Sequence, residues 1–373
     1  MAARHDSRFA GGSRSHGGSG TGGYAPVTRR RAVSRPVSRP VSRAAPTAGL
    51  TGGPAAGDGL GGQDRSAAVT GRPGGNLRTA RHVLPGMTLP PGTEVLRYAA
   101  FTADPAGGNP AGVVPDAAGL DDDTQLAVAA ELGYSETAFL TALGERAFAV
   151  RYFSPLAEVP FCGHATIASA VALAERIGPG PLLFETKAGP VPVEVAADPE
   201  GRPVATLTSV EPAVEPVSDA DVAEALAALD WSADDLDETL PPRIAYAGAR
   251  HLVLAAATRK RLADLAYDFD RLARLMTRLD LTTVQLVHRV SDTVFHVRDP
   301  FPVGGVVEDP ATGAAAAAFG AYLSELEGLG QAVLTLHQGE DMGRPGVLRV
   351  ELREGDRRVR VSGAAVRIPD PQD

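Results

Sequence analysis

Glu136 is the residue of this 373-residue sequence best suited to acid–base chemistry. It follows Gly133, a residue type that ends helices, and it precedes the apolar run Ala138-Phe139-Leu140. A carboxylate in a partly desolvated pocket takes up a proton more readily, which suits a base that must also return the proton it removes. A lone glutamate is more often an ordinary surface residue, so this role depends on what surrounds it.

Two similar turns precede two Ala-rich apolar segments. The first turn, Gly163-His164-Ala165-Thr166, opens a helix expected over 165–177, and the second, Pro310-Ala311-Thr312-Gly313, opens a helix expected over 314–326. Helix N-termini carry partial positive charge and unpaired N–H groups, so two of them facing one cleft would hold a carboxylate or a developing enolate. The alternative is that the glycines only let the helices pack tightly.

Three further residues near these turns could take part in chemistry. Asp309 stands where the N-cap of the second helix belongs, so capping alone could explain it. His164 lies near the start of the first helix, where a histidine can pass or orient a proton, although a lone histidine is more often structural. Cys162 is the single cysteine, and we interpret it as a small buried apolar residue in preference to a reactive thiol.

Other segments carry weaker signals. The loops around Arg250 and Arg344 could orient a substrate carboxylate, but turn formation explains both equally well. Residues 107–110 are typical of a turn. The sequence has no Walker loop, no Rossmann glycine fingerprint after a strand and no Cys/His zinc spacing. We therefore expect a site for a small anionic molecule, without a cofactor and without a metal.

The periodicity predicts a strand-rich α+β protein whose second half repeats the plan of the first. Each Ala-rich helix is apolar on all sides, which indicates a buried helix enclosed by strands. We expect an N-terminal domain over 93–210, completed by 358–368, and a C-terminal domain over 211–357. Strands are expected at 95–101, 148–152, 191–195, 204–209, 252–254, 284–287, 293–297, 347–352 and 359–361.

Charge divides the chain into two parts. Residues 1–92 hold 13 arginines and 3 aspartates, a balance of +10, so residues 93–373 carry −19 of the total of −9. An acidic body binds nucleic acid poorly, because that affinity comes largely from phosphate neutralisation. No apolar stretch is long enough for a membrane span. The lone cysteine fits a reducing compartment, and we expect a cytoplasmic protein.

Residues 1–92 are rich in Gly, Ser, Arg and Pro and contain a short Ser-Arg-Pro-Val repeat. Such a composition cannot bury enough apolar surface to offset its ordering entropy, so we expect a disordered tail. Met87 stands just before the first expected strand, and translation that begins there is an equal alternative. A tail that tethers the protein to nucleic acid or to a membrane is the least favoured hypothesis.

Five motifs in one order resemble the PhzF family of phenazine-biosynthesis-like isomerases, and the resemblance covers residues 94–368. The motifs are Gly108 to Val114, Ser135 to Phe139, Pro160 to Thr166, Glu308 to Gly313 and Gln338 to Pro345.

The resemblance implies a diaminopimelate-epimerase-like fold: two similar domains, each a curled sheet around a central helix, with the site in the cleft between them. It implies a cofactor-free, homodimeric isomerase in which the family's catalytic Glu, His and Asp fall on Glu136, His164 and Asp309. Asn109 would lie near the site.

Two departures bear on the substrate and on the mechanism. The phenazine enzyme has a serine where this chain has Ala314, so phenazine precursors are in doubt as its substrate. The related epimerases use two cysteines, and the second would fall near Pro310, so the single Cys162 excludes a two-thiol mechanism.

We therefore expect an isomerase in which Glu136 moves a proton between carbons of a small carboxylate. Gly163, Thr312, Gly313 and Ala314 would bind this substrate at the helix starts. A non-catalytic small-molecule binding protein that kept the cleft is the alternative.

Overall fold

The computed structural model describes residues 89–90 and 92–370, which all belong to one compact unit. The expected disordered tail and the Met87 start lie almost entirely outside the described residues. The described residues form an α+β fold, as the periodicity predicted. None of their helices is long and apolar enough to cross a membrane.

The helices begin and end where local sequence signals place them. Asp121 accepts a hydrogen bond from the Thr124 amide at the start of α1, and Gly133 ends that helix in the left-handed conformation. Ser218 caps α3 by accepting a hydrogen bond from the Asp221 amide. The α-helices are α1 (Asp122–Leu132), α2 (Gly163–Ile177), α3 (Asp219–Leu229), α4 (Arg259–Ala263), α5 (Phe269–Leu279) and α6 (Gly313–Glu327), and the 3-10 helices are η1 (Ala233–Asp235), η2 (Pro302–Gly304) and η3 (Glu340–Met342).

Strands make up most of the remaining ordered chain. In the first half they are β1 (Leu96–Ala100), β2 (Asn109–Val114), β3 (Glu136–Ala142), β4 (Ala147–Phe153), β5 (Glu158–Val159), β6 (Gly180–Thr186), β7 (Gly189–Ala197) and β8 (Pro203–Thr208). In the second half they are β9 (Ala213–Pro216), β10 (Arg243–Tyr246), β11 (Arg250–Ala255), β12 (Thr283–Arg289), β13 (Val294–Pro300), β14 (Glu308–Asp309), β15 (Ala332–Gln338), β16 (Gly346–Arg353) and β17 (Asp356–Arg367). Every strand expected from the periodicity is present. The pairing brings Asn109, expected in a turn, into the start of β2.

The order of elements and their pairing occur twice along the chain. In the first half β2 runs parallel to β3 and β4 parallel to β6, with antiparallel pairs β1–β2, β3–β4, β6–β7 and β7–β8. The second half has the parallel pairs β11–β12 and β13–β15 and the antiparallel pairs β10–β11, β12–β13, β15–β16 and β16–β17. The short strands β5 and β14 pair with β4 and β13 and precede the long helices α2 and α6.

The long strand β17 joins the two repeats. It pairs with β16 of the second repeat and with both β1 and β8 of the first. The strands β17, β1, β2, β3, β4, β6, β7 and β8 therefore close into a ring of eight. Helix α2 packs against β1, β2, β3, β7, β8 and β17 of this ring, and eleven consecutive residues from His164 to Ala174 are buried.

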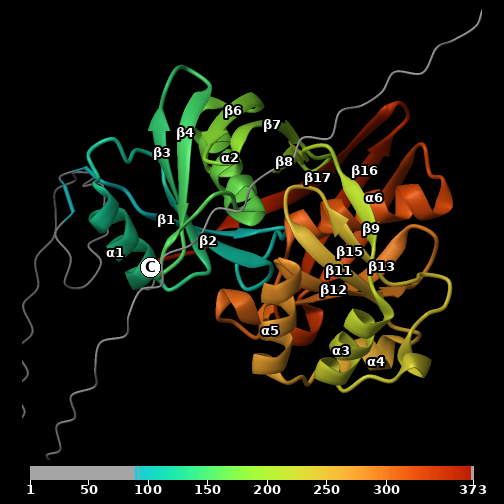
Figure 1. The fold of residues 1–373 in the computed structure, drawn as a ribbon. Coiled ribbons are helices and arrows are strands. Elements are labelled where there is room, and N and C mark those ends of the chain that lie inside the picture. Colours follow the sequence, from blue (N-terminus) through green and yellow to red (C-terminus); the bar gives the residue numbers. More distant parts are fainter. Residues whose placement is uncertain (1–88, 91, 371–373) are drawn as a thin grey trace, which may run out of the picture. The chain divides into compact units, whose positions relative to one another are not determined.

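Helix α6 occupies the matching place in the second repeat, where it packs against β9, β10, β11, β12, β16 and β17. Alternate residues of the strands face opposite sides. Val253 and Val287 belong to the core around α6, whereas Leu252 and Leu286 belong to a second core beneath α3, α4 and α5. These three helices lie together, away from α6 (Figure 1).

Candidate active site

The first residues of α2 and α6 meet backbone to backbone. A Cβ atom at Gly163 would lie 3.6 Å from the Gly313 Cα and 3.6 Å from the Ala314 amide nitrogen. A Cβ atom at Gly313 would lie 3.1 Å from the ring of Phe101, so a side chain there would force the ring to move. The two glycines of the sequence motifs therefore do allow tight packing. They also bring two helix N-termini, with their unpaired N–H groups, to the same place.

Glu136, Cys162 and His164 form a compact group at the start of α2. The Glu136 carboxylate lies 3.4 Å from His164 Nε2, and the Cys162 thiol approaches Glu136 Oε2 at 3.6 Å. Glu136 is the first residue of β3, beside Ala111 of β2, and its side chain is 14% exposed. His164 also contacts the Ser135 hydroxyl at 3.3 Å through Nε2. The carboxylate is thus held at the edge of the core, with partial access to solvent.

Cys162 is buried, as the sequence predicted, but its surroundings are polar as well as apolar. It is the N-cap residue of α2, and its thiol faces Glu136 and His164 instead of apolar side chains alone. Burial, and then the neighbouring Glu136 carboxylate, raise the pKa of the thiol well above its ordinary value. The thiol therefore stays protonated near neutral pH and donates to Glu136.

Asn109 connects His164 to the second helix start. Its Nδ2 atom donates to Asp309 Oδ1 at 2.8 Å and to the Ala311 carbonyl at 3.1 Å, and the same atom lies 3.1 Å from His164 Nδ1. The two hydrogens of this amide nitrogen serve three acceptors, so one hydrogen is shared between two of them. Because an amide nitrogen donates and does not accept, Nδ1 of His164 is the acceptor in its contact. We accordingly assign the His164 proton to Nε2, which faces Glu136.

Asp309 lies in β14 and is not the N-cap that its sequence position suggested. Thr312 is the N-cap of α6, and its hydroxyl donates to Asp309 Oδ2 at 2.6 Å. Thr312, not Pro310, therefore holds the place in the second repeat that Cys162 holds in the first. Burial raises the pKa of Asp309, against the opposing effects of nearby His164, Thr312 and Asn109.

Gln338 holds the start of α6 in place through hydrogen bonds. Its Oε1 atom accepts from the Thr312 amide at 2.9 Å. Its Nε2 atom lies within 3.0 Å of three acceptors, namely the Asp309 carbonyl, the Thr312 hydroxyl and Asp299 Oδ2. The side chain is fully buried. One amide therefore satisfies several buried groups that would otherwise have no water to bind.

Asp299 extends this network towards β11. It pairs with Asp309 across β13 and β14, and it accepts from the Thr283 hydroxyl at 2.6 Å, which in turn contacts His251 Nδ1 at 2.7 Å. Burial raises the pKa of Asp299 well above its ordinary value. Burial also lowers the pKa of His251 to about 3, so its ring is neutral. His251 is thus a core residue.

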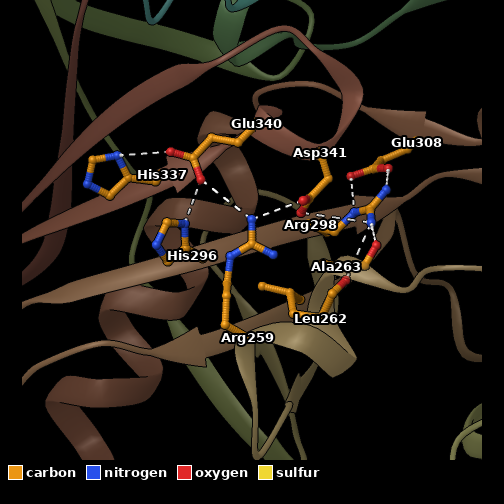
Figure 2. Close-up of polar contacts among 9 residues, drawn as sticks. All are labelled: Arg259, Leu262, Ala263, His296, Arg298, Glu308, His337, Glu340 and Asp341. Carbon is orange, nitrogen blue, oxygen red and sulfur yellow. Dashed lines mark hydrogen bonds and ion pairs between the residues drawn. The ribbon is translucent and has the colours of Figure 1, made fainter.

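Glu308 points away from the site because neighbouring strand residues face opposite sides. Its carboxylate forms a two-point ion pair with Arg298, at 2.9 Å and 2.5 Å, and both side chains are buried. Arg298 also donates to the Ala263 carbonyl at 2.7 Å. Figure 2 shows this pair beside a more exposed group of Arg259, Glu340 and Asp341. The pair holds β14 in place, and with it Asp309.

A cavity of about 410 Å³ opens in front of both helix starts. Its lining includes Glu136, Cys162, Gly163, His164, Asp309, Thr312, Gly313 and Ala314, together with Phe161, Tyr246 and Thr283. Arg250 lines the cavity, with its guanidinium 3.1 Å from Glu215. Arg344 does not line it, because this side chain donates to the Gly107 and Gly108 carbonyls and so supports the loop before Asn109.

Within the described part of the chain, Glu136, Cys162 and His164 are the group that could hold a metal ion, since their ligand atoms lie within 4.8 Å of one another. The thiol is neutral, and the proton assigned to His164 occupies the nitrogen nearest Glu136. The Cys162 thiol would have to lose its proton, and the His164 proton would have to move to Nδ1, before Sγ and Nε2 could ligate a metal. The expectation of a metal-free site remains a prediction.

Sequence reasoning missed several polar residues around the site. Ser135 and Gln338 stood inside recognised motifs but received no role. Asp299 and Thr283 gave no sequence signal, because a polar residue at the end of a strand usually faces solvent.

Comparison with known proteins places the chain among isomerases. A family model described as phenazine biosynthesis-like protein (PhzC-PhzF) matches residues 98–370. The uncharacterized isomerase YfhB of Bacillus subtilis is 32% identical over 284 residues, which cover 73% of this chain and 96% of the relative. The uncharacterized isomerase YddE of Escherichia coli K12 is 31% identical over 286 residues, covering 73% and 95%.

Solved structures agree with this grouping. A PhzF-family phenazine biosynthesis protein of Bacillus anthracis superposes with a TM-score of 0.67 and 26% identity, covering 74% of this chain and 96% of that one. A predicted epimerase of Pseudomonas aeruginosa gives 0.66 and 29%, covering 74% and 97%. A probable proline racemase of Agrobacterium radiobacter, at 0.51 and 14%, shares the fold.

Proposed function

Because this chain belongs to the phenazine biosynthesis-like (PhzC-PhzF) family and is an isomerase, we propose that it moves a proton between two carbons of a small carboxylate by acid–base catalysis at Glu136. The repeats would act as two lobes, with the cavity between them as the substrate site. One observation carries the proposal: a partly exposed carboxylate opens into the cavity onto which two helix N-termini converge.

The helix starts would bind the negative charge. The amide groups at Gly163 and Gly313 belong to two 15-residue helices, and donors of this kind stabilise both a carboxylate and the enolate that forms when its neighbouring carbon loses a proton. Such donors are fixed by the helices before the substrate arrives, so they need no reorganisation during the reaction.

Glu136 would then act twice. Its carboxylate takes a proton from a carbon of the substrate, and the electron pair of the broken C–H bond passes into the enolate. The protonated Glu136, which is 14% exposed and can exchange its proton with solvent, next protonates a different carbon, one that a double bond conjugates with the enolate. That double bond shifts by one position, and the Glu136 carboxylate is regenerated. No atom is gained or lost overall, which is the balance of an isomerisation.

His164 and Cys162 would position this base. The Nε2–H of His164 and the neutral thiol of Cys162 both face the same Glu136 oxygen, at 3.4 Å and 3.6 Å. These contacts are long enough to be given up when Glu136 turns to a substrate carbon. Asp309 and Asn109 hold the His164 ring from its other side.

Solvent exchange tests the proposal without knowledge of the substrate. The protein is incubated in D₂O with the low-molecular-weight fraction of a cell extract, and mass spectrometry follows metabolites that gain one deuterium. An isomerase that passes through a carbon acid labels its substrate, whereas a protein that only binds it labels nothing. Absence of labelling in any carboxylate would overturn the proposal.

The variant Glu136→Gln assigns the base. Removal of a general base costs about 10² to 10⁴ in rate, so labelling should fall by that factor while the ligand still binds. Glu145→Gln is the matched control, because this glutamate is exposed at the turn between β3 and β4. Equal labelling by Glu136→Gln and the native protein would remove Glu136 from the role.

A further inference from the structure

A second cavity, of about 330 Å³, lies beside the candidate active site. The two cavities share Phe161, Ala188, Tyr246, Gly248 and Ala314 in their linings, so they are adjacent. We call the second cavity the annex. We propose that the annex holds an apolar arm, such as an aromatic ring or a branched alkyl group, of the same substrate whose carboxylate lies at the helix starts. This inference rests on the proposed function and specifies its substrate class.

The walls of the annex are predominantly apolar. Beyond the shared residues they include Pro190, Val191, Leu207, Val210 and Ala317. Leu207 and Ala317 are buried, Val191 is half-buried, and Val210 is 49% exposed at the rim. Apolar surface in contact with water gains stability when an apolar ligand group covers it, so this lining selects such a group.

Two polar side chains of the annex, Ser209 and Arg358, already have partners within the protein. The Ser209 hydroxyl donates to the Val210 carbonyl and accepts from the Val359 amide. Arg358 is exposed and pairs with Asp356 at 3.0 Å and 2.9 Å. A polar or charged arm would have to compete with these bonds, whereas an apolar arm leaves them intact.

The start of α6 links the two cavities. Gly313 lines the first cavity, Ala314 lines both, and Ala317 lines the annex. Residues three apart on a helix lie on the same face, so Ala314 and Ala317 form one continuous methyl surface. A ligand whose carboxylate sits at Gly313 can therefore extend directly along this surface. The small side chains keep the passage open.

Two carboxylates that differ only in their apolar arm test the annex. Benzoate carries one ring and biphenyl-4-carboxylate carries a second, and isothermal titration calorimetry gives their Kd values for the full chain. Burial of the second ring should make biphenyl-4-carboxylate bind at least about 10-fold more tightly than benzoate.

Variants at the rim remove this preference by different means. Val210→Trp fills the annex and Val210→Asp adds a charge, so each should bring the ratio of the two Kd values to within about 2-fold while the Kd of benzoate stays the same. Val290→Trp and Val290→Asp are matched controls, because Val290 is 55% exposed at the turn between β12 and β13. They should keep the native ratio.

Three outcomes contradict the inference. Equal Kd values for the two carboxylates with the native protein overturn the annex and leave the proposed function standing. A native preference that survives both Val210 variants also overturns the annex. Failure of both carboxylates to bind overturns the anion site of the proposed function, and the annex with it.

Discussion

The two helix starts occupy equivalent places in the two repeats, yet they are built from different chemistry. At α2 the N-cap is Cys162, and its neighbours Glu136 and His164 meet at 3.4–3.8 Å. At α6 the N-cap is Thr312, and its contacts with Asp309 and Gln338 measure 2.6–3.0 Å. The start of α2 therefore carries titratable side chains whose contacts are long, whereas the start of α6 is held in place by short hydrogen bonds.

This difference separates two tasks that an acid–base site must perform. A base has to exchange its partner for a substrate carbon, so long contacts suit Glu136. An anion site has to stay fixed while charge develops, so a saturated network suits the start of α6. We infer that the first repeat provides the base that transfers the proton. The second repeat provides a rigid anion site that holds the substrate during the transfer.

Gln338→Ala should give the largest loss of stability, because it leaves the buried Thr312 amide without its side-chain acceptor and removes the Gln338 donor from the Asp309 carbonyl and from Asp299 Oδ2. We expect the free energy of unfolding to fall by roughly 3 kcal/mol or more, measured by urea denaturation. Gln125→Ala is the control: this buried glutamine makes one side-chain hydrogen bond, to the Leu120 carbonyl, and its loss should cost about 1 kcal/mol. Equal losses of unfolding free energy in the two variants would mean that Gln338 contributes no more to stability than a buried side chain with a single hydrogen bond.

The pH dependence of stability should also distinguish the start of α6 from the start of α2. Burial raises the pKa of Asp299 and of Asp309, so the folded protein keeps protons that the unfolded chain releases at the ordinary aspartate pKa, near 4. The free energy of unfolding should therefore fall as the pH rises above about 4, by up to about 1.4 kcal/mol per pH unit for each group while it remains protonated in the folded state.

Asp299→Asn isolates one of these groups, because asparagine stays neutral at every pH. Urea denaturation between pH 4 and pH 7 should show a shallower decline for this variant than for the native chain. The control Asp292→Asn changes an exposed aspartate and should keep the native slope. If the unfolding free energy of Asp299→Asn fell with pH as steeply as that of the native protein, Asp299 would not be a source of the pH dependence.

The smallest expected effect concerns Cys162. Because burial and the Glu136 carboxylate raise the pKa of its thiol, iodoacetamide should modify this single cysteine far more slowly at pH 7.5 than it modifies free cysteine. Glu136→Gln removes the second cause and should raise the labelling rate by less than about 10-fold. Rapid labelling of the native chain would show that the thiol is a reactive nucleophile and not a neutral donor.

Local patterns predicted the elements well because their signals are local. The Asp121 cap, the Gly133 stop and the Ser218 cap each depend on residues within about one helical turn, and Gly133 ends α1 as its residue type predicted. The burial of both Ala-rich helices also followed from sequence, since a helix without a polar face has to be enclosed. Asp309 was misplaced as a cap because α6 begins only at Gly313, after the N-cap Thr312, and two residue types that favour caps stand close together here.

The sequence by itself determined the α+β class, the two enclosed helices and the residue types at their starts, because backbone propensity and apolar periodicity are properties of neighbouring residues. Only the tertiary structure decided that Gly163 lies against Gly313, that Asn109 bridges His164 and Asp309 across 200 positions of sequence, and that Gln338 and Asp299 lie buried behind them. These contacts depend on how two distant repeats pack, and no local pattern encodes the distance between side chains so far apart along the chain.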